Sequence, residues 1–206
     1  MTTDRTENTF TIDASSIKFG PGVTTEAGHE LARLNVSRVM VVTDSKMSGS
    51  DAVANALDSL KHANIDYAVF DQVSVEPTDI SFKEAIKFAT DGNFDGFLPV
   101  GGGSSIDTAK AANLYKTYPA DFLTYVNAPI GYGIPVPGAL MPLVAIPTTA
   151  GTGSETTGVS IFDFEELGTK TGIAHRSLRP DIGLVDPDNT RSLPRMVAAC
   201  SGFDVL

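Results

Sequence analysis

The sequence has few of the residues that build several common kinds of protein site. Its 206 residues include one cysteine, Cys200, and no tryptophan. A single cysteine excludes an intrachain disulfide and a cysteine-based metal cluster, and it fits a reducing compartment. Lysine and arginine together number 15 against 25 acidic residues, which gives a formal net charge of −10. Because nucleic-acid binding requires clustered positive charge, we expect no nucleic-acid partner.

Long apolar runs and recognisable targeting segments are also absent from the sequence. No run approaches the ~20 apolar residues that span a bilayer, so we expect no membrane partner. Residues 1–10 are polar and include Asp4 and Glu7. They have neither the apolar core of a signal peptide nor the composition of a transit peptide. These features favour a cytoplasmic protein. If the source is eukaryotic, we expect a mitochondrial location instead.

Apolar segments alternate with segments of helical spacing along most of the chain. The expected strands are 38–42, 67–70, 94–100 and 143–146, and the expected helices are 52–63, 81–90 and 105–115. This alternation is typical of α/β proteins, and it predicts a Rossmann-like parallel sheet with flanking helices. Pro99 is unusual in a central strand because proline removes a hydrogen-bond donor. We therefore expect a local irregularity or a shifted strand boundary there.

The pattern changes after the last of these strands. Residues 148–157 form a loop rich in small residues, and 159–164 and 170–174 are expected to pair as a hairpin around an acidic turn. Neither segment continues the alternation of strand and helix.

The last residues have the pattern of a helix that begins but does not end. Ser192 is expected as the N-cap, with Pro194 in the first turn. The residues from there to Leu206 permit a helix and offer no C-cap, which indicates an interrupted helix. We therefore expect an α/β domain over 1–191 and the first helix of a missing all-α domain over 192–206.

Three consecutive glycines, Gly101 to Gly103, follow the expected strand 94–100 and precede a helix. Glycines let the backbone turn tightly and let a phosphate approach without meeting a Cβ, while the helix directs unpaired N–H groups at the same point. This arrangement predicts a seat for a diphosphate. The alternative is a simple glycine turn in which Ser104 and Asp107 form a capping pair.

The residues around these glycines resemble a known signature. Residues 101–110 match the GGGS-x-x-D-x-AK motif of the iron-containing (group III) alcohol dehydrogenases. Residues 147–155 resemble the P-T-T-x-G-T-G-S-E loop of that family, 180–187 its P-x-x-x-x-x-D-P segment, and 18–22 its N-terminal motif. Within the family, several segments are most similar to the hydroxyacid-oxoacid transhydrogenase branch: 75–79, 112–115, 127–131 and 155–163. The resemblance implies a dehydroquinate synthase-like N-terminal domain.

The resemblance also implies NAD as the cofactor. The residues that it implies for cofactor binding are Asp44, Gly101, Gly102, Gly103, Ser104, Asp107, Thr148, Thr149, Ser154 and Lys170. A carboxylate at the end of the first strong strand binds ribose hydroxyls and disfavours a 2′-phosphate, so Asp44 favours NAD over NADP. The bare sequence leaves Asp44 open as a turn residue. It also leaves Lys110 open as the partner of Asp107 in a structural ion pair.

Asp204 resembles the first ligand of the family's metal, Fe(II) or Zn(II), in a helical D-x-x-x-H motif. The histidines of this sequence, His29, His62 and His175, do not match the ligand positions of the family. A catalytic metal needs about three protein ligands and an open position. We therefore expect the chain as given to bind metal weakly and to lack turnover.

The function implied by the resemblance is metal-dependent hydride transfer between an alcohol or hydroxyacid and NAD. In the transhydrogenase branch a hydroxyacid such as 4-hydroxybutyrate reduces the bound cofactor, and an oxoacid such as 2-oxoglutarate reoxidises it. The expected partners are these small molecules and, at full length, further copies of the chain. Two alternatives stay open: a naturally short, non-catalytic nucleotide-binding module, and a metal-dependent lyase of the dehydroquinate-synthase type.

Overall fold

The computed structural model describes residues 15–205, and its centre is a parallel sheet. Six strands lie in the order β1-β8-β5-β4-β2-β3, and every neighbouring pair is parallel. The strands are β1 (Ser16–Phe19), β2 (Arg38–Val42), β3 (Asp66–Phe70), β4 (Gly96–Gly101), β5 (Val144–Pro147) and β8 (Ile182–Val185). The predicted α/β class is confirmed.

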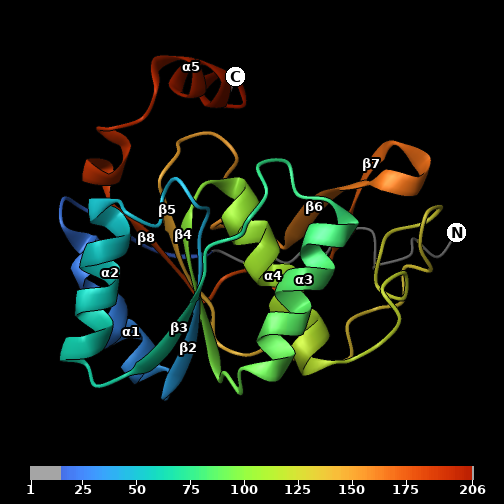
Figure 1. Ribbon diagram of the computed structural model, residues 1–206, viewed down its shortest axis with the longest axis horizontal. Helices are drawn as coiled ribbons and strands as arrows, with labels where there is room; N and C mark the ends of the chain where they lie inside the picture. The colour runs from blue at the N-terminus through green and yellow to red at the C-terminus, as the bar shows by residue number, and fades with distance from the viewer. Residues whose placement is uncertain (1–14, 206) are drawn as a thin grey trace, which may run out of the picture.

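Helices cover both faces of the sheet (Figure 1). They are α1 (Ala27–Arg33), α2 (Asp51–His62), α3 (Asp79–Asp91) and α4 (Gly103–Thr117). Val39 and Val41 of β2 pack into the core under α1 and α2, whereas Met40 and Val42 pack into the core under α3 and α4. Successive side chains of a strand point to opposite faces, so a strand buried on both faces is apolar throughout. This is why the run 38–42 contains no alternating polar residues after Arg38.

The starts of two helices are fixed by polar caps in the sequence. The Ser50 side chain accepts a hydrogen bond from the backbone N–H of Val53 at the start of α2. Thr78 and Ser81 form a reciprocal capping box at the start of α3. Each cap pairs backbone donors that a helix leaves unsatisfied in its first turn.

Two strands of the sheet, β1 and β8, were not predicted from the sequence pattern. Each has only four residues, and they pair with each other in register from Ser16 with Ile182 to Phe19 with Val185. Both depend on a pairing between segments far apart in the chain, which a local pattern of residues does not reveal. The helix α1 between β1 and β2 was also not among the predicted helices.

Asp186 links the segments that follow β1 and β8. Its Oδ2 accepts hydrogen bonds from the backbone N–H and the hydroxyl of Thr24, and its Oδ1 accepts from the N–H groups of Gly22 and Asp188. Burial alone would raise the pKa of Asp186, but these hydrogen bonds outweigh it and hold the pKa below its usual range. The motif 18–22 and the motif 180–187 are therefore joined by hydrogen bonds at one end of the sheet.

The expected strand 94–100 begins at Gly96 and contains Pro99 without interruption. The predicted boundary was therefore wrong by two residues at its start. Pro99 lies opposite Val42 of β2, and β4 continues past it to pair with β5 at Val100 and Gly101.

Beside the sheet lies the predicted hairpin, with β6 (Val159–Phe164) paired antiparallel to β7 (Thr169–Ala174). Near the end of the chain lies α5 (Arg195–Phe203), which Figure 1 shows above one edge of the sheet and apart from the other helices. In the part of the chain that the structure describes, no helix combines the length and the apolarity needed to cross a membrane.

The predicted limits of the last helix were wrong at both ends. Pro194, not Ser192, is the N-cap of α5, in an extended conformation and with no side-chain cap. Proline fixes its own φ and disfavours helical conformation in the residue before it, so the helix begins after it. Asp204 is the C-cap, so the helix ends at Phe203, one residue after the weak helix former Gly202.

Candidate functional site

A cleft of about 960 Å³ opens at the edge of the sheet where β4 and β5 end. Its walls come from the turn after β2, the segment between β3 and α3, the start of α4, the loop 148–157, the hairpin and α5. All but one of the predicted site residues line it: Asp44, Gly102, Gly103, Ser104, Asp107, Thr148, Thr149, Ser154, Lys170 and Asp204. The exception is Gly101, which is buried at the end of β4.

The glycine turn between β4 and α4 is shorter than the sequence suggested. Gly102 alone separates the two elements, and it is the N-cap of a helix that begins at Gly103 instead of residue 105. Ser104 therefore lies inside the first turn, so the alternative capping pair of Ser104 with Asp107 does not form. The N–H of Ser105 donates to the carbonyl of Gly102 at 3.1 Å, which leaves the N–H groups of Gly103 and Ser104 to give this end of the helix a partial positive charge.

The glycines are needed here for close approach and not for an unusual turn. None of Gly101, Gly102 and Gly103 has a left-handed φ, so the chain turns tightly at Gly102 without a backbone conformation that only glycine favours. A Cβ at Gly101 would lie 2.4 Å from the Oγ of Ser105 in the first turn of α4. A Cβ at Gly103 would lie 3.0 Å from the hydroxyl of Thr152 across the cleft.

Thr149 faces Gly102 across the same narrow part of the cleft. A Cβ on Gly102 would lie 3.3 Å from the Cγ2 of Thr149 and 3.4 Å from its Oγ1. Thr148 precedes it and is buried, and its N–H donates to the carbonyl of Gly101. The loop 148–157 is therefore fastened to the end of β4, with its threonine hydroxyls close to the start of α4.

Asp44 adopts the turn role that the bare sequence had left open. Its Oδ1 accepts hydrogen bonds from the backbone N–H groups of Lys46 and Met47, at 2.9 and 3.1 Å. Within residues 15–205, Oδ2 has no hydrogen-bond partner, and Asp44 lines the cleft. One oxygen thus orders the turn, while the other is free to accept from a ligand hydroxyl.

Asp107 and Lys110 form the structural ion pair that was the alternative for Lys110. The Lys110 Nζ lies 3.4 Å from Oδ1 of Asp107 and donates to the carbonyl of Val159 at 2.7 Å. The Asp107 Oδ2 accepts from the N–H of Ile161 at 3.0 Å. Burial lowers the pKa of Lys110 and raises the pKa of Asp107, because both charges are withdrawn from water. The pair links α4 to β6 and so fixes one wall of the cleft.

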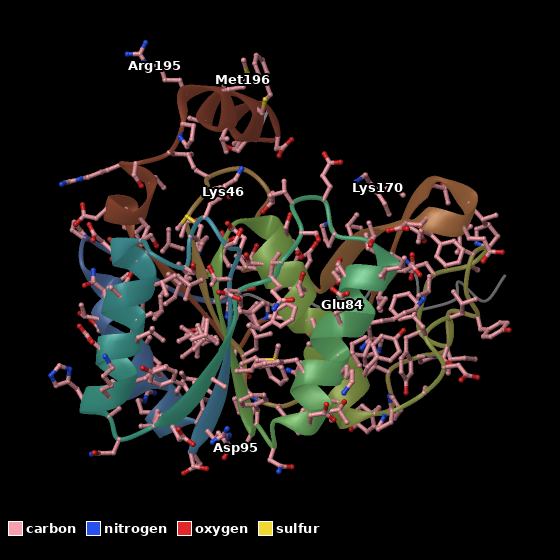
Figure 2. All side chains as sticks on the ribbon, in the orientation of Figure 1. Lys46, Glu84, Asp95, Lys170, Arg195 and Met196 are labelled. Carbon is pink, nitrogen blue, oxygen red and sulfur yellow. The ribbon has the colours of Figure 1, made fainter. Side chains whose placement is uncertain are left out.

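Lys170 of β7 lies on the rim of the cleft and is half exposed. It forms an ion pair with Asp163 at 3.2 Å, across the hairpin. Figure 2 shows Lys46 and Lys170 at the same edge of the molecule as α5. These two lysines place positive charge at the cleft, although the protein has a net charge of −10.

None of the predicted site residues belongs to the apolar part of the cleft. Val73, Val75 and Pro77, between β3 and α3, line it together with Ile161 of β6 and Val197 of α5. Val75 is 72% exposed to solvent. The signals for this wall in the sequence were the resemblances of residues 75–79 and 155–163 to one branch of the family.

The donors in the described chain do not assemble a metal centre. Asp204 lines the cleft, and Cys200 lies one turn before it on α5. Within residues 15–205, no group of three or more His, Cys, Asp or Glu side chains lies close enough to hold a metal ion. A single carboxylate is too few for a bound catalytic metal.

Most of the chain matches the model of one protein family. A family model described as "Iron-containing alcohol dehydrogenase" matches residues 14–187. The chain belongs to the iron-containing alcohol dehydrogenase family. This membership supports the predicted oxidoreductase class, and it favours neither the non-catalytic module nor the lyase.

Relatives of known sequence and structure agree with this family. The mitochondrial hydroxyacid-oxoacid transhydrogenase of Bos taurus is 54% identical over 202 residues, which are 98% of this chain and 43% of that protein. A 1,3-propanediol oxidoreductase structure matches with a TM-score of 0.87 and 28% identity, over 95% of this chain and 50% of that one. The sulfoacetaldehyde reductase of Bifidobacterium kashiwanohense, solved with NAD+, matches with a TM-score of 0.85 and 26% identity, over 95% and 51%. The chain thus spans about half, or less, of the length of these iron-containing alcohol dehydrogenase relatives.

Proposed function

We propose that this chain forms the NAD-binding part of an oxidoreductase that transfers hydride between a hydroxyacid and an oxoacid. The observation that carries the proposal is the start of α4. Its first-turn N–H groups face a cleft in which Gly102 and Gly103 present no side chain. An anionic diphosphate fits such a place, because backbone donors and the helix dipole favour negative charge even in a protein with a net charge of −10.

The remaining contacts to NAD follow from the walls of the cleft. The free oxygen of Asp44 would accept hydrogen bonds from ribose hydroxyls and would repel a 2′-phosphate, which favours NAD over NADP. Thr149 and Ser154 would meet the cofactor from the loop opposite α4, and Lys170 would contact it from the hairpin. The bound NAD+ of the sulfoacetaldehyde reductase relative supports this choice of cofactor.

The substrate class rests on the transhydrogenase relatives, which match nearly the whole chain at 52–54% identity. The names of these relatives include mitochondrial, which favours that compartment if the source is eukaryotic. We further propose Asp204 as one ligand of the family's metal, Fe(II) or Zn(II), with its other ligands outside residues 15–205. In this proposal residues 192–206 begin the metal-binding helical domain, and the complete enzyme is a homo-oligomer.

A titration of NADH fluorescence tests the cofactor site directly. Wild-type protein should give saturable binding, and NADP should compete less well than NAD. Gly102→Val should weaken NADH binding by tenfold or more, about 1.4 kcal/mol, because its side chain would fill the space between the turn and Thr149. Gly49→Val is the control, because Gly49 is exposed, has no left-handed φ and has open space around it. Equal binding by wild type and Gly102→Val would contradict the diphosphate site.

A turnover assay tests the metal assignment separately. The chain supplied with Fe(II), NAD and 4-hydroxybutyrate should produce no NADH, because the described residues offer one metal ligand. Reduction of NAD by the purified 206-residue protein would overturn this expectation while leaving the NAD site intact.

A further inference from the structure

The helix α5 rests on the rest of the protein through a very small contact. Ser201 is its one buried residue, whereas Met196 and Phe203 are each 75% exposed. The backbone of Ser201 lies against Gly151 in the loop 148–157. A Cβ on Gly151 would lie 2.1 Å from the carbonyl oxygen of Ser201, 2.8 Å from its carbonyl carbon and 3.0 Å from its Cα. All three are backbone atoms, so no side-chain rotation could relieve the overlap.

Gly151 itself does not line the cleft, but the residues on both sides of this contact do. Thr149 and Thr152 flank it in the loop, and they face the glycine turn at the start of α4. On α5, Val197 and Asp204 lie on the side that lines the cleft. A single glycine contact therefore sets the distance between two walls of the same cleft.

We propose that Gly151 is a positioning residue, which fixes the wall formed by α5 over the bound dinucleotide by leaving room for the Ser201 backbone. The proposal rests on the NAD-binding function proposed above. A methyl group needs about 3.3 Å or more from a carbonyl oxygen, so an alanine at position 151 would displace α5 by about 1 Å. Gly151 has no left-handed φ, so the substitution would act through this displacement and not through backbone strain.

The test compares Gly151→Ala with Gly202→Ala in the 206-residue protein. Gly202 is the neighbour of Ser201 on α5, has no left-handed φ, and a Cβ there would meet nothing within 4 Å. Both variants add one methyl group near the contact between Gly151 and Ser201. Only Gly151→Ala places the methyl group between the two segments, whereas Gly202→Ala places it in open space. The readouts are hydrogen–deuterium exchange of the α5 peptide and the dissociation constant of NADH.

We expect Gly151→Ala to accelerate exchange in α5 and to weaken NADH binding by about tenfold. Gly202→Ala should leave binding unchanged and should slow exchange, because alanine favours the helix. Unchanged exchange in Gly151→Ala, or faster exchange with unchanged NADH affinity, would overturn the positioning role. If wild type and Gly202→Ala also fail to bind NADH, the NAD-binding function itself is wrong, and the positioning role falls with it.

Discussion

Replacing Lys110 with methionine separates a structural role for this lysine from a role in cofactor binding. Its ammonium group is fully buried, and its partners are Asp107, Thr157 and the carbonyl of Val159. Lys110 does not line the cleft, although Asp107 does. Methionine keeps the length and apolar stem of lysine but removes the charge and the donors.

The expected loss of stability is large because the partner charge stays behind. Without Lys110, Asp107 would keep a carboxylate that is only 11% exposed and has lost its counter-charge. Removing one partner of a buried pair costs about 3–5 kcal/mol. With a urea m-value of about 2 kcal/mol per molar, the unfolding midpoint should fall by about 2 M.

Urea unfolding followed by circular dichroism measures this loss, and Lys87→Met provides the matched control. Lys87 forms an i,i+4 ion pair with Asp91 on α3, but its side chain is 78% exposed. Such a surface pair contributes less than about 1 kcal/mol, so its removal should move the midpoint little. A double variant, Lys110→Met with Asp107→Leu, should recover part of the stability, because neither buried charge is then left unpaired.

The NADH affinity of Lys110→Met, measured under conditions where the protein is fully folded, decides between the two roles. We expect it to fall by less than about tenfold, or 1.4 kcal/mol. A larger loss of affinity, or a midpoint as little changed as that of Lys87→Met, would refute the structural assignment of the pair.

Two further predictions concern the packing of the sheet and helices. Asp186→Asn should lower stability by about 1.5–3 kcal/mol at pH 6 through weaker hydrogen bonds. Because the pKa of Asp186 is lowered in the folded state, its contribution is present above the unfolded pKa of about 3.9 and is lost as the pH falls through the folded pKa. The difference in Tm between wild type and variant should therefore shrink from pH 6 to pH 3, and a constant difference would contradict it. Gly28→Ala should destabilise by about 1–3 kcal/mol, because its Cβ would lie 2.3 Å from the carbonyl oxygen of Ser59. Gly49→Ala, with open space around it, should not destabilise in the same thermal scan, and equal losses in the two variants would refute the close packing of α1 on α2.

Local patterns in the sequence were sufficient for the central strands and for three of the helices. The predicted strand 38–42 matches β2 residue for residue. A strand buried on both faces is a continuous apolar run, so its ends are easy to recognise in the sequence. The helix predicted over 81–90 is α3, although it begins two residues earlier, at Asp79 after the cap Thr78. The limits of α5 were not predictable in this way, because Pro194 permits both a first-turn and an N-cap position.

Elements that depend on distant partners were missed or misplaced. The short strands β1 and β8 are stabilised by pairing with each other, although nearly the whole chain lies between them. The motifs beside them, residues 18–22 and 180–187, were recognised by resemblance without any indication that Asp186 would bind the segment after β1.

The sequence alone determined the chemical identity of the candidate site: three glycines before a helix, a carboxylate after a strand, and a loop of threonines and glycines. These are short-range patterns, and each residue needs only its neighbours in the chain to be recognised. Tertiary structure alone decided how these residues are used. It paired Lys110 with Val159 and Asp107 instead of turning it to the cleft, and it placed Gly151 against Ser201. Burial and contact between distant segments depend on the packing of the whole fold, which no local pattern of residues specifies.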